Sequence, residues 1–350
     1  MAACTVSIVD ADIIPSSFGR VTINDVARAA GVSVSTVSKV VNRRYDVAPA
    51  TSKRVMSVVA ELGYETSLVA SSLRRRRTNV IGILVAEFES FSVELLKGVS
   101  TAASGTGYEL LAYSGLVSDD SHIGWERRSL SRLAGTLIDG AIIVTPTTLM
   151  PTTSIPVVAI DPHSGAGGPS TIDSDNVGGA RVATQYLIDL GHRRIAHIRG
   201  RSDLASAQLR EAGYRESLEE AGIPFDPALV RDGGYQAALT AEAARELLTR
   251  PDRPTAVFAA NDVSALGVVK VAHELGLRVP EDLSVIGFDD IPDAASSTPP
   301  LTTVAQPLHD LGAQALRMLI ELLDGHEVPG HVQLPAELVV RASTGPAPIR

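Results

Sequence analysis

Polar side chains stand directly after several apolar runs of the chain. Asp161 closes VVAID, Asn261 follows VFAA and Asp289 follows VIGF. Apolar runs of this length predict buried strands, and parallel α/β sheets bind ligands at the carboxyl ends of their strands. Carboxylate and amide oxygens accept hydrogen bonds from hydroxyl groups, and the amide also donates. These three residues therefore indicate a polar small-molecule site.

Motifs for catalysis are missing from the sequence. There is no GxxxxGK[ST], HExxH, CxxC or GxSxG, and no GxGxxG lies between the first predicted strand and its helix. The absent glycines also argue against a Rossmann-type oxidoreductase. His192 and His197 flank a predicted strand, and we interpret them as structural rather than as metal ligands. We expect no enzymatic activity, no cofactor and no metal site.

The elements that position these residues alternate between strand and helix from Thr78 onward, which predicts a two-lobed, doubly wound α/β domain. The predicted buried parallel strands are 80–86, 109–115, 140–146, 157–161, 194–200, 256–262 and 284–290. The predicted helices are 93–103, 125–134, 177–190, 205–221, 241–248 and 263–275. Trp125 stands on one of these helices, away from the strand ends, and we interpret it as a packing residue.

A small helical module precedes this domain. Thr22 and Asp25 form a capping-box variant, and Gly31 stands where a left-handed residue ends a helix. Ser33 is the expected N-cap of a second short helix, and a third helix is expected over 49–62. The close spacing of the first two is that of a helix-turn-helix; a purely structural helix pair is the alternative.

The charge of the chain is strongly segregated. The formal net charge is −9, yet residues 20–77 carry 11 Lys and Arg against 4 Asp and Glu, a net +7. Residues 78–350 carry a net −14. A basic module on an acidic body indicates a polyanionic partner, unless the basic stretch is only a solvated face.

Composition and location signals are simple. With 45% hydrophobic residues, the 350-residue chain can bury a large core in two or three domains and is not a disordered chain. The only cysteine is Cys4, which is typical of a reducing compartment. We find no membrane-spanning run and no convincing secretory signal, and expect a cytoplasmic protein without membrane contact.

Residues 21–42, VTINDVARAAGVSVSTVSKVVN, closely resemble the headpiece of the LacI/GalR family of bacterial transcription regulators. The resemblance continues through GGARVATQYLIDLGHRRIAHIRG (178–200), VIGFDD (285–290) and PPLTTVAQP (299–307). It implies an all-α helix-turn-helix headpiece plus a two-lobed, periplasmic-binding-protein-like α/β effector domain. The expected parts are an N-terminal extension (1–19, disordered), the headpiece (20–65), a hinge helix and linker (66–77) and the effector-binding and dimerisation domain (78–350).

The resemblance also implies residues that contact DNA. Val34 and Ser35 choose bases, Lys39 reaches a guanine edge, and Leu73 of the hinge helix enters the minor groove. The remaining expected contacts, mostly to phosphates, are Thr22, Thr36, Ser38, Asn42, Arg43 and Arg44. The alternative for Val34 is a half-buried helix residue.

A cleft for the effector is implied as well. Its expected lining residues are Phe91, Asp161, Ser206, Arg210, Tyr235, Asn261, Asp289 and Leu308. Carboxylates, an arginine fork and a tyrosine ring suit a mono- or oligosaccharide. The alternatives are that the aspartates cap helices and that Arg210 pairs with an acid such as Glu211. The loop after the first strand, EFESFSVE (87–94), departs from the family pattern, so its phenylalanines meet the ligand differently.

The sequence thus predicts a DNA-binding transcriptional regulator, and by resemblance a repressor. We expect a homodimer on double-stranded, near-palindromic operator DNA, controlled by a sugar effector, in the bacterial cytoplasm and at the nucleoid when bound. The C-terminal RASTGPAPIR lacks the leucine-rich heptads of tetrameric relatives, which favours the dimer. The alternative is a cytoplasmic sugar-binding module without a role in gene regulation.

Overall fold

The computed structural model describes residues 21–41, 46–64, 77–115, 123–148, 153–163 and 168–349. The chain divides into two compact units, Met1–Arg76 and Arg77–Arg350. The predicted extension at 1–19 and the predicted hinge segment up to residue 76 lie outside the described residues. The same holds for Asn42, Arg43, Arg44 and Leu73.

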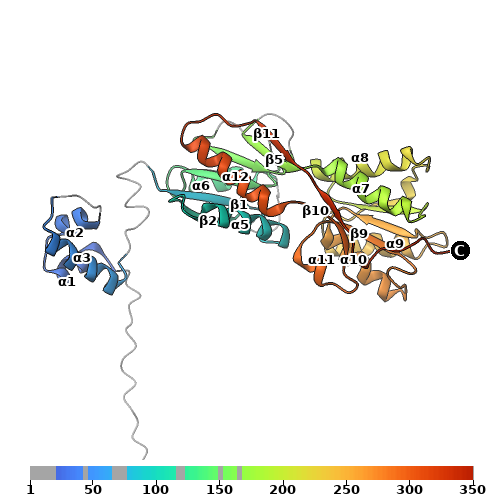
Figure 1. The fold of residues 1–350 in the computed structure, drawn as a ribbon, viewed down its shortest axis with the longest axis horizontal. Helices are drawn as coiled ribbons and strands as arrows, with labels where there is room; N and C mark the ends of the chain where they lie inside the picture. Colours follow the sequence, from blue (N-terminus) through green and yellow to red (C-terminus); the bar gives the residue numbers. More distant parts are fainter. Residues whose placement is uncertain are drawn as a thin grey trace, which may run out of the picture. The chain divides into compact units, whose positions relative to one another are not determined.

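The first unit contains the three predicted helices, α1 (Ile23–Ala30), α2 (Val34–Val41) and α3 (Pro49–Leu62) (Figure 1). The Asp25 carboxylate accepts from the backbone N–H of Thr22 at 2.9 Å and from its hydroxyl at 2.6 Å, as the capping box predicts. Gly31 ends α1 with φ 61°. A core of Val26, Ala27, Ala30, Val37, Val40 and Val55 holds the helices together.

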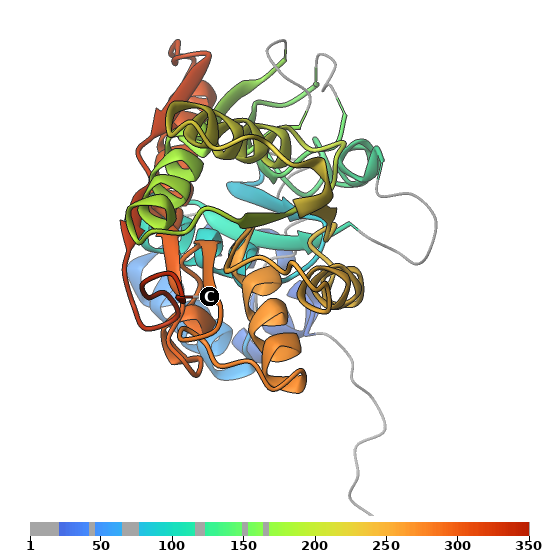
Figure 2. The same cartoon turned by 90° about the vertical axis from the view of Figure 1, so that its right-hand side faces the viewer.

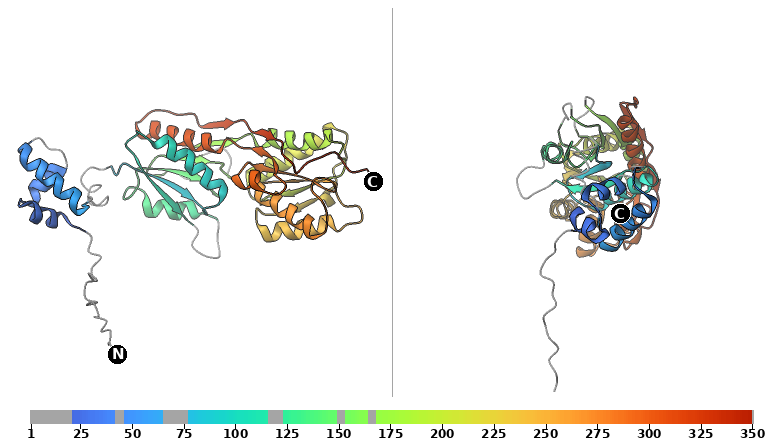
Figure 3. Two further views of the ribbon diagram at one scale, coloured as in Figure 1. Left: turned by 60° about the horizontal axis from the view of Figure 1, so that its bottom comes forward. Right: turned by 90° about the vertical axis from the view of Figure 1, so that its left-hand side faces the viewer.

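The first lobe of the second unit is built on a six-stranded parallel sheet in the order β11-β5-β4-β3-β1-β2. Its strands are β1 (Val80–Val85), β2 (Glu109–Ser114), β3 (Gly140–Val144), β4 (Val157–Ile160), β5 (Ser170–Ser174) and β11 (His331–Leu334). Helices α5 (Ser90–Ala103) and α12 (Leu308–Leu323) pack side by side on one face, and α6 (Trp125–Leu133) covers the other (Figure 3). Alternate side chains of β1 therefore enter two separate cores.

The second lobe has the sheet order β12-β10-β9-β8-β6-β7, parallel except for β12. Its strands are β6 (Ile195–Arg199), β7 (Val230–Asp232), β8 (Ala256–Ala259), β9 (Ser284–Asp289), β10 (Thr302–Ala305) and β12 (Glu337–Val339). Helices α7 (Asn176–Asp189) and α8 (Ala205–Glu220) cover one face, and α9 (Ala237–Leu248) and α10 (Asp262–Glu274) the other (Figure 2). A 3-10 turn (Pro227–Leu229) and the short α11 (Pro292–Ser296) complete it.

Three segments join the lobes: β5 to α7, β10 to α12, and β11 to β12. They run close together, because β11 pairs with β5 in one lobe and β12 with β10 in the other. Gln306 connects two of them, since its side-chain carbonyl accepts a hydrogen bond from the Ser174 hydroxyl.

The two-lobed, doubly wound prediction is confirmed, with differences in detail. β5, β7 and β10–β12 were not predicted, because segments such as STIDS (170–174) are short and polar and lack a continuous apolar run. The prediction that 109–115 is buried was wrong, because β2 is an edge strand and is only partly covered. His197 lies within β6 rather than beside it. No helix within the described ranges is long and apolar enough to cross a membrane.

Candidate functional site

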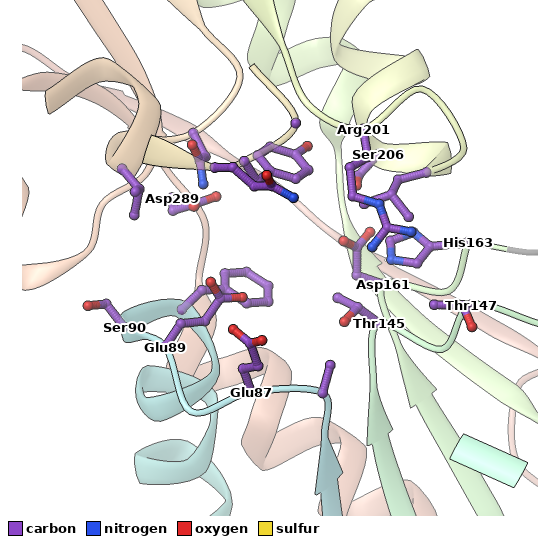
Figure 4. A pocket seen from close by; sticks show the side chains of 18 of the residues that line it. Glu87, Glu89, Ser90, Thr145, Thr147, Asp161, His163, Arg201, Ser206 and Asp289 are labelled. Carbon is purple, nitrogen blue, oxygen red and sulfur yellow. The ribbon is translucent and has the colours of Figure 1, made fainter. Parts of the chain in front are cut away.

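A cavity of about 400 Å³ lies between the two lobes of the second unit (Figure 4). The first lobe lines it with the segments that follow β1, β3 and β4 and with the start of α6. The second lobe contributes the segments after β6, β7, β8 and β9 and the first turns of α8. This volume is within the usual range for small-molecule sites, and the position at the carboxyl ends of parallel strands is the expected one.

Backbone strain is concentrated around the cavity. Six residues other than glycine have positive φ in the part of the chain that the structure describes, and four of them line the cavity. These are Thr145 (49°), Asp161 (49°), Tyr235 (59°) and Asp289 (119°). Residues other than glycine rarely adopt a backbone conformation with positive φ, because it costs free energy. Such residues are often found at ligand sites, where the surrounding fold holds the backbone in place.

Arg210 and Asp289 form the buried polar centre of the site. The Arg210 guanidinium lies 3.5 Å from the Asp289 carboxylate and 3.8 Å above the Phe288 ring. Its Nε donates to the Asn176 side-chain oxygen at 2.8 Å, and Nη1 also donates to the Ala260 carbonyl. Arg210 is thereby fixed with its charge facing the cavity. Glu211, the alternative partner considered above, instead pairs with other arginines.

Asp289 also connects the cavity to the segments that join the lobes. The Gln306 amide donates to Asp289 at 2.6 Å, and Gln306 bonds to Ser174. Burial raises the pKa of the Asp289 carboxyl, although Arg210 and Gln306 act in the opposite direction. A ligand that contacts Asp289 therefore acts on a group bonded to one lobe connection directly and to a second one through Gln306.

Three polar side-chain atoms on the cavity wall are buried without a hydrogen-bond partner: Trp125 Nε1, His163 Nδ1 and the Tyr235 hydroxyl. The described residues contain only five such atoms. A buried polar group without a partner costs about 1–3 kcal/mol, so such groups are normally satisfied. Burial lowers the pKa of His163, which favours the neutral imidazole. The three atoms are unsatisfied polar groups within the wall of the cavity.

Seven of the eight residues expected in the effector cleft line this cavity: Phe91, Asp161, Ser206, Arg210, Tyr235, Asn261 and Asp289. The eighth, Leu308, is the first residue of α12 and is buried in the apolar core of the first lobe. The helix-capping alternative does not fit the aspartates. The next described element after Asp161 is β5, and Ile291 occupies the N-cap of α11.

The cavity also includes residues that sequence reasoning missed. Glu87, Thr145 and Arg201 follow β1, β3 and β6, so the strand-end rule applied to every strand would have found them. The interpretation of Trp125 as a packing residue is confirmed, since its ring is fully buried in the apolar core of the first lobe. The expectation that it stands away from the strand ends was wrong, because α6 begins beside them and Trp125 also lines the cavity.

In the first unit, α2 presents the residues predicted to read bases. Val34 is 40% exposed, which also fits the half-buried alternative, and Ser35 is exposed. The Ser33 hydroxyl lies 2.8 Å from both the Ser35 and Thr36 hydroxyls, and it accepts from the Thr36 backbone N–H at 3.2 Å. Lys39 is paired with Asp46 at 2.5 Å. The remaining predicted residues of this unit are Thr22, held by Asp25, and Ser38, which is half-buried on α2.

Comparison with known proteins agrees with this arrangement. Residues 22–67 match the family model of bacterial regulatory proteins, lacI family, and residues 184–344 match a periplasmic binding protein-like domain. The chain is 38% identical over 307 residues to the ribose operon repressor of Escherichia coli K12, covering 85% of this chain and 92% of the relative. It is 35% identical to the transcriptional repressor PurR of Photobacterium profundum, covering 92% and 98%.

Solved structures give the same result. The lac repressor dimer bound to operator and an anti-inducer superposes with a TM-score of 0.78 at 30% identity, covering 93% of this chain and 100% of that one. The complex of the transcriptional regulator CelR with cellobiose has a TM-score of 0.67 at 35% identity, with the same coverage.

A helix-turn-helix headpiece on a two-lobed domain with a polar cavity defines a DNA-binding transcriptional regulator of the ligand-responsive class. The chain belongs to the lacI family of bacterial regulatory proteins. Membership in this family of regulators agrees with the prediction that the protein is not an enzyme. Within the described residues, no group of three or more His, Cys, Asp or Glu is placed to hold a metal ion.

Proposed function

We propose that the protein is a repressor that binds a near-palindromic operator as a homodimer and is controlled by a sugar in the cavity between its lobes. The observation that carries this proposal is the cavity itself, with its buried polar atoms that lack partners, in a chain that has a lacI-family headpiece. The cytoplasm, and the nucleoid when operator is bound, is the proposed location.

The dimer is supported by the reach of one recognition helix. A single helix in the major groove reads about four base pairs, so two-fold symmetry is needed for a longer and tighter site. The solved lac repressor relative is a dimer on its operator. We assign base contacts to Val34, Ser35 and Lys39, and the minor-groove wedge to Leu73.

A sugar is supported by the chemistry of the cavity. Asp161, Asn261 and Asp289 offer acceptors to paired hydroxyls, and Arg210 offers a fixed donor fork. Two relatives are a ribose operon repressor and a regulator solved with cellobiose.

The mechanism is a shift between two arrangements of the lobes. A sugar that binds both lobes favours one arrangement, and the three lobe connections transmit that preference to the headpieces of the dimer. Coupling of about 1–3 kcal/mol, or roughly 5- to 150-fold in operator affinity, is normal for such a switch.

The test is fluorescence anisotropy of the full chain on the DNA upstream of its own gene, at two salt concentrations, with and without a sugar panel. Specific binding that one sugar shifts at least tenfold supports the proposal. Binding that is sequence-blind and lost with modest salt contradicts it and leaves a sugar-binding protein without gene control. The Leu73→Ala variant should lose operator kinking but keep sugar affinity.

A further inference from the structure

The cavity holds more negative charge than its own cations balance. Four carboxylates line it: Glu87, Glu89, Asp161 and Asp289. Figure 4 shows Glu87 and Glu89 next to each other in the loop after β1, and Asp161 apart from them, beside His163 and Thr145. Of the four, only Asp289 has a cationic partner within ion-pair distance among the described residues.

The positive groups of the cavity are already committed elsewhere. Arg210 is paired with Asp289 at 3.5 Å. Arg201 forms a two-point pair with Asp203, at 3.1 and 2.6 Å. Burial lowers the pKa of His163, so its imidazole adds no charge near neutral pH. Glu87, Glu89 and Asp161 are therefore three acids without a counter-charge.

Glu89 carries the clearest sign of this imbalance. It is the N-cap of α5, where its carboxylate faces the Ser92 backbone N–H in a capping box. That helix end favours a negative charge, yet partial burial of the carboxyl and the neighbouring charge of Glu87 raise the pKa of Glu89, although both glutamates are exposed residues. A ligand cation at this place would relieve the repulsion.

The wall of the cavity also contains polar groups without hydrogen-bond partners. The Trp125 ring is fully buried, and its Nε1, which only donates, has no acceptor. The Tyr235 hydroxyl on the opposite lobe also lacks a partner.

We propose that the ligand is a hydroxylated molecule with a protonated amine, an amino sugar, whose ammonium group lies between Glu87 and Glu89. A neutral sugar would give these carboxylates hydrogen bonds but no counter-charge, and an ammonium group gives both. The inference rests on the proposed function, because it uses the same cavity as the effector site.

The test compares matched ligand pairs on the full chain at neutral pH. The pairs are glucosamine and glucose, galactosamine and galactose, and the chitosan disaccharide and cellobiose. Trp125 is the only tryptophan of the chain and lines the cavity, so its fluorescence reports occupancy directly. We expect one amino sugar to bind at least about tenfold more tightly than its neutral partner, the effect of a charge-assisted bond.

Three variants assign that preference to the acids. Glu87→Gln, which leaves the helix cap intact, and the double variant with Glu89→Gln should reduce the preference stepwise to about onefold. Glu109→Gln is the control, because Glu109 is exposed at the start of β2 and does not line the cavity. A panel in which no amino sugar gains tenfold, or a preference that survives the double variant, overturns the inference.

The same protein and ligands separate this inference from the proposed function. A neutral sugar that binds and shifts operator affinity refutes the ammonium site and supports the repressor. An amino sugar that binds through Glu87 and Glu89 but leaves operator affinity unchanged supports the ammonium site and refutes effector control.

Discussion

Replacing Arg210 with methionine tests the buried centre of the site. The change keeps much of the side-chain volume but removes the charge opposite Asp289 and the donors to Asn176 and to the Ala260 carbonyl. It also removes the cation above the Phe288 ring. Removing one partner of a buried ion pair costs about 3–5 kcal/mol, and these losses are not additive. We expect Arg210→Met to lose about 4 kcal/mol at alkaline pH, where Asp289 is ionised.

The loss should depend on pH in one direction. Burial raises the pKa of Asp289 to about 7 even beside Arg210, and without Arg210 this pKa rises further. The carboxyl is then mostly protonated at neutral pH, so the destabilisation should grow as the pH rises above 7 and an unpaired buried carboxylate must form, and should shrink as the pH falls through 7. Adding Asp289→Asn should recover stability at alkaline pH, because the amide carries no charge.

The assay is chemical denaturation followed by far-ultraviolet circular dichroism, which reports both lobes. Arg245→Met is the matched control, since Arg245 pairs with Glu274 on the surface and should cost less than about 1 kcal/mol. The reasoning is refuted if Arg210→Met costs no more than this control at alkaline pH, or if the double variant is no more stable than Arg210→Met there.

Three further changes follow from the packing and the headpiece. Burial lowers the pKa of His197 to about 4, below the ordinary 6.5, so the wild type should lose up to about 3 kcal/mol as the pH falls from 6.5 to 4. His197→Phe, stacked between the same aromatic rings, should flatten that slope in thermal unfolding, and an unchanged slope would assign it to other groups. A Cβ atom at Gly98 would lie 2.0 Å from the His309 carbonyl oxygen, so Gly98→Ala should force α5 away from α12 and lower the free energy of unfolding by several kcal/mol. The control is Gly330→Ala, which has nothing within 4 Å and should be close to neutral in the same denaturation assay. Ser35→Ala should narrow the affinity ratio of operator to random DNA while leaving the salt slope intact, and a uniform loss on both DNAs would assign Ser35 to phosphate instead.

Strand ends were the most reliable guide from sequence to site. Asp161, Asn261 and Asp289 follow apolar runs that are buried strands, so their position at the cavity follows from strand polarity alone. Ser206 and Tyr235 have no such local signal and were found only by family resemblance. Their approach to the cavity depends on how the second lobe packs.

The errors have physical reasons. Trp125 was expected to stand away from the strand ends, because helix periodicity does not tell which end of a helix faces a neighbouring lobe. Leu308 was placed in the cleft, yet α12 begins there and directs this residue into the core with Leu311 and Leu319. β5 and β10 were missed because their sequences are short and partly polar. A strand that lies between other strands can be covered by the packing of its neighbours even when it has few apolar residues of its own.

The three lobe connections have a consequence for synthesis on the ribosome. The first lobe takes α12 and β11 from residues beyond 307, after the second lobe has been almost completely made. Until α12 and β11 are made, the first lobe lacks one edge strand of its sheet and one helix of its core. The surfaces of α5 and β1 that pack against α12 therefore stay exposed while some 220 further residues are added. The three-helix headpiece has only local contacts and meets no such delay. A chain truncated before α12 would therefore carry a complete DNA-reading module on an unfinished lobe.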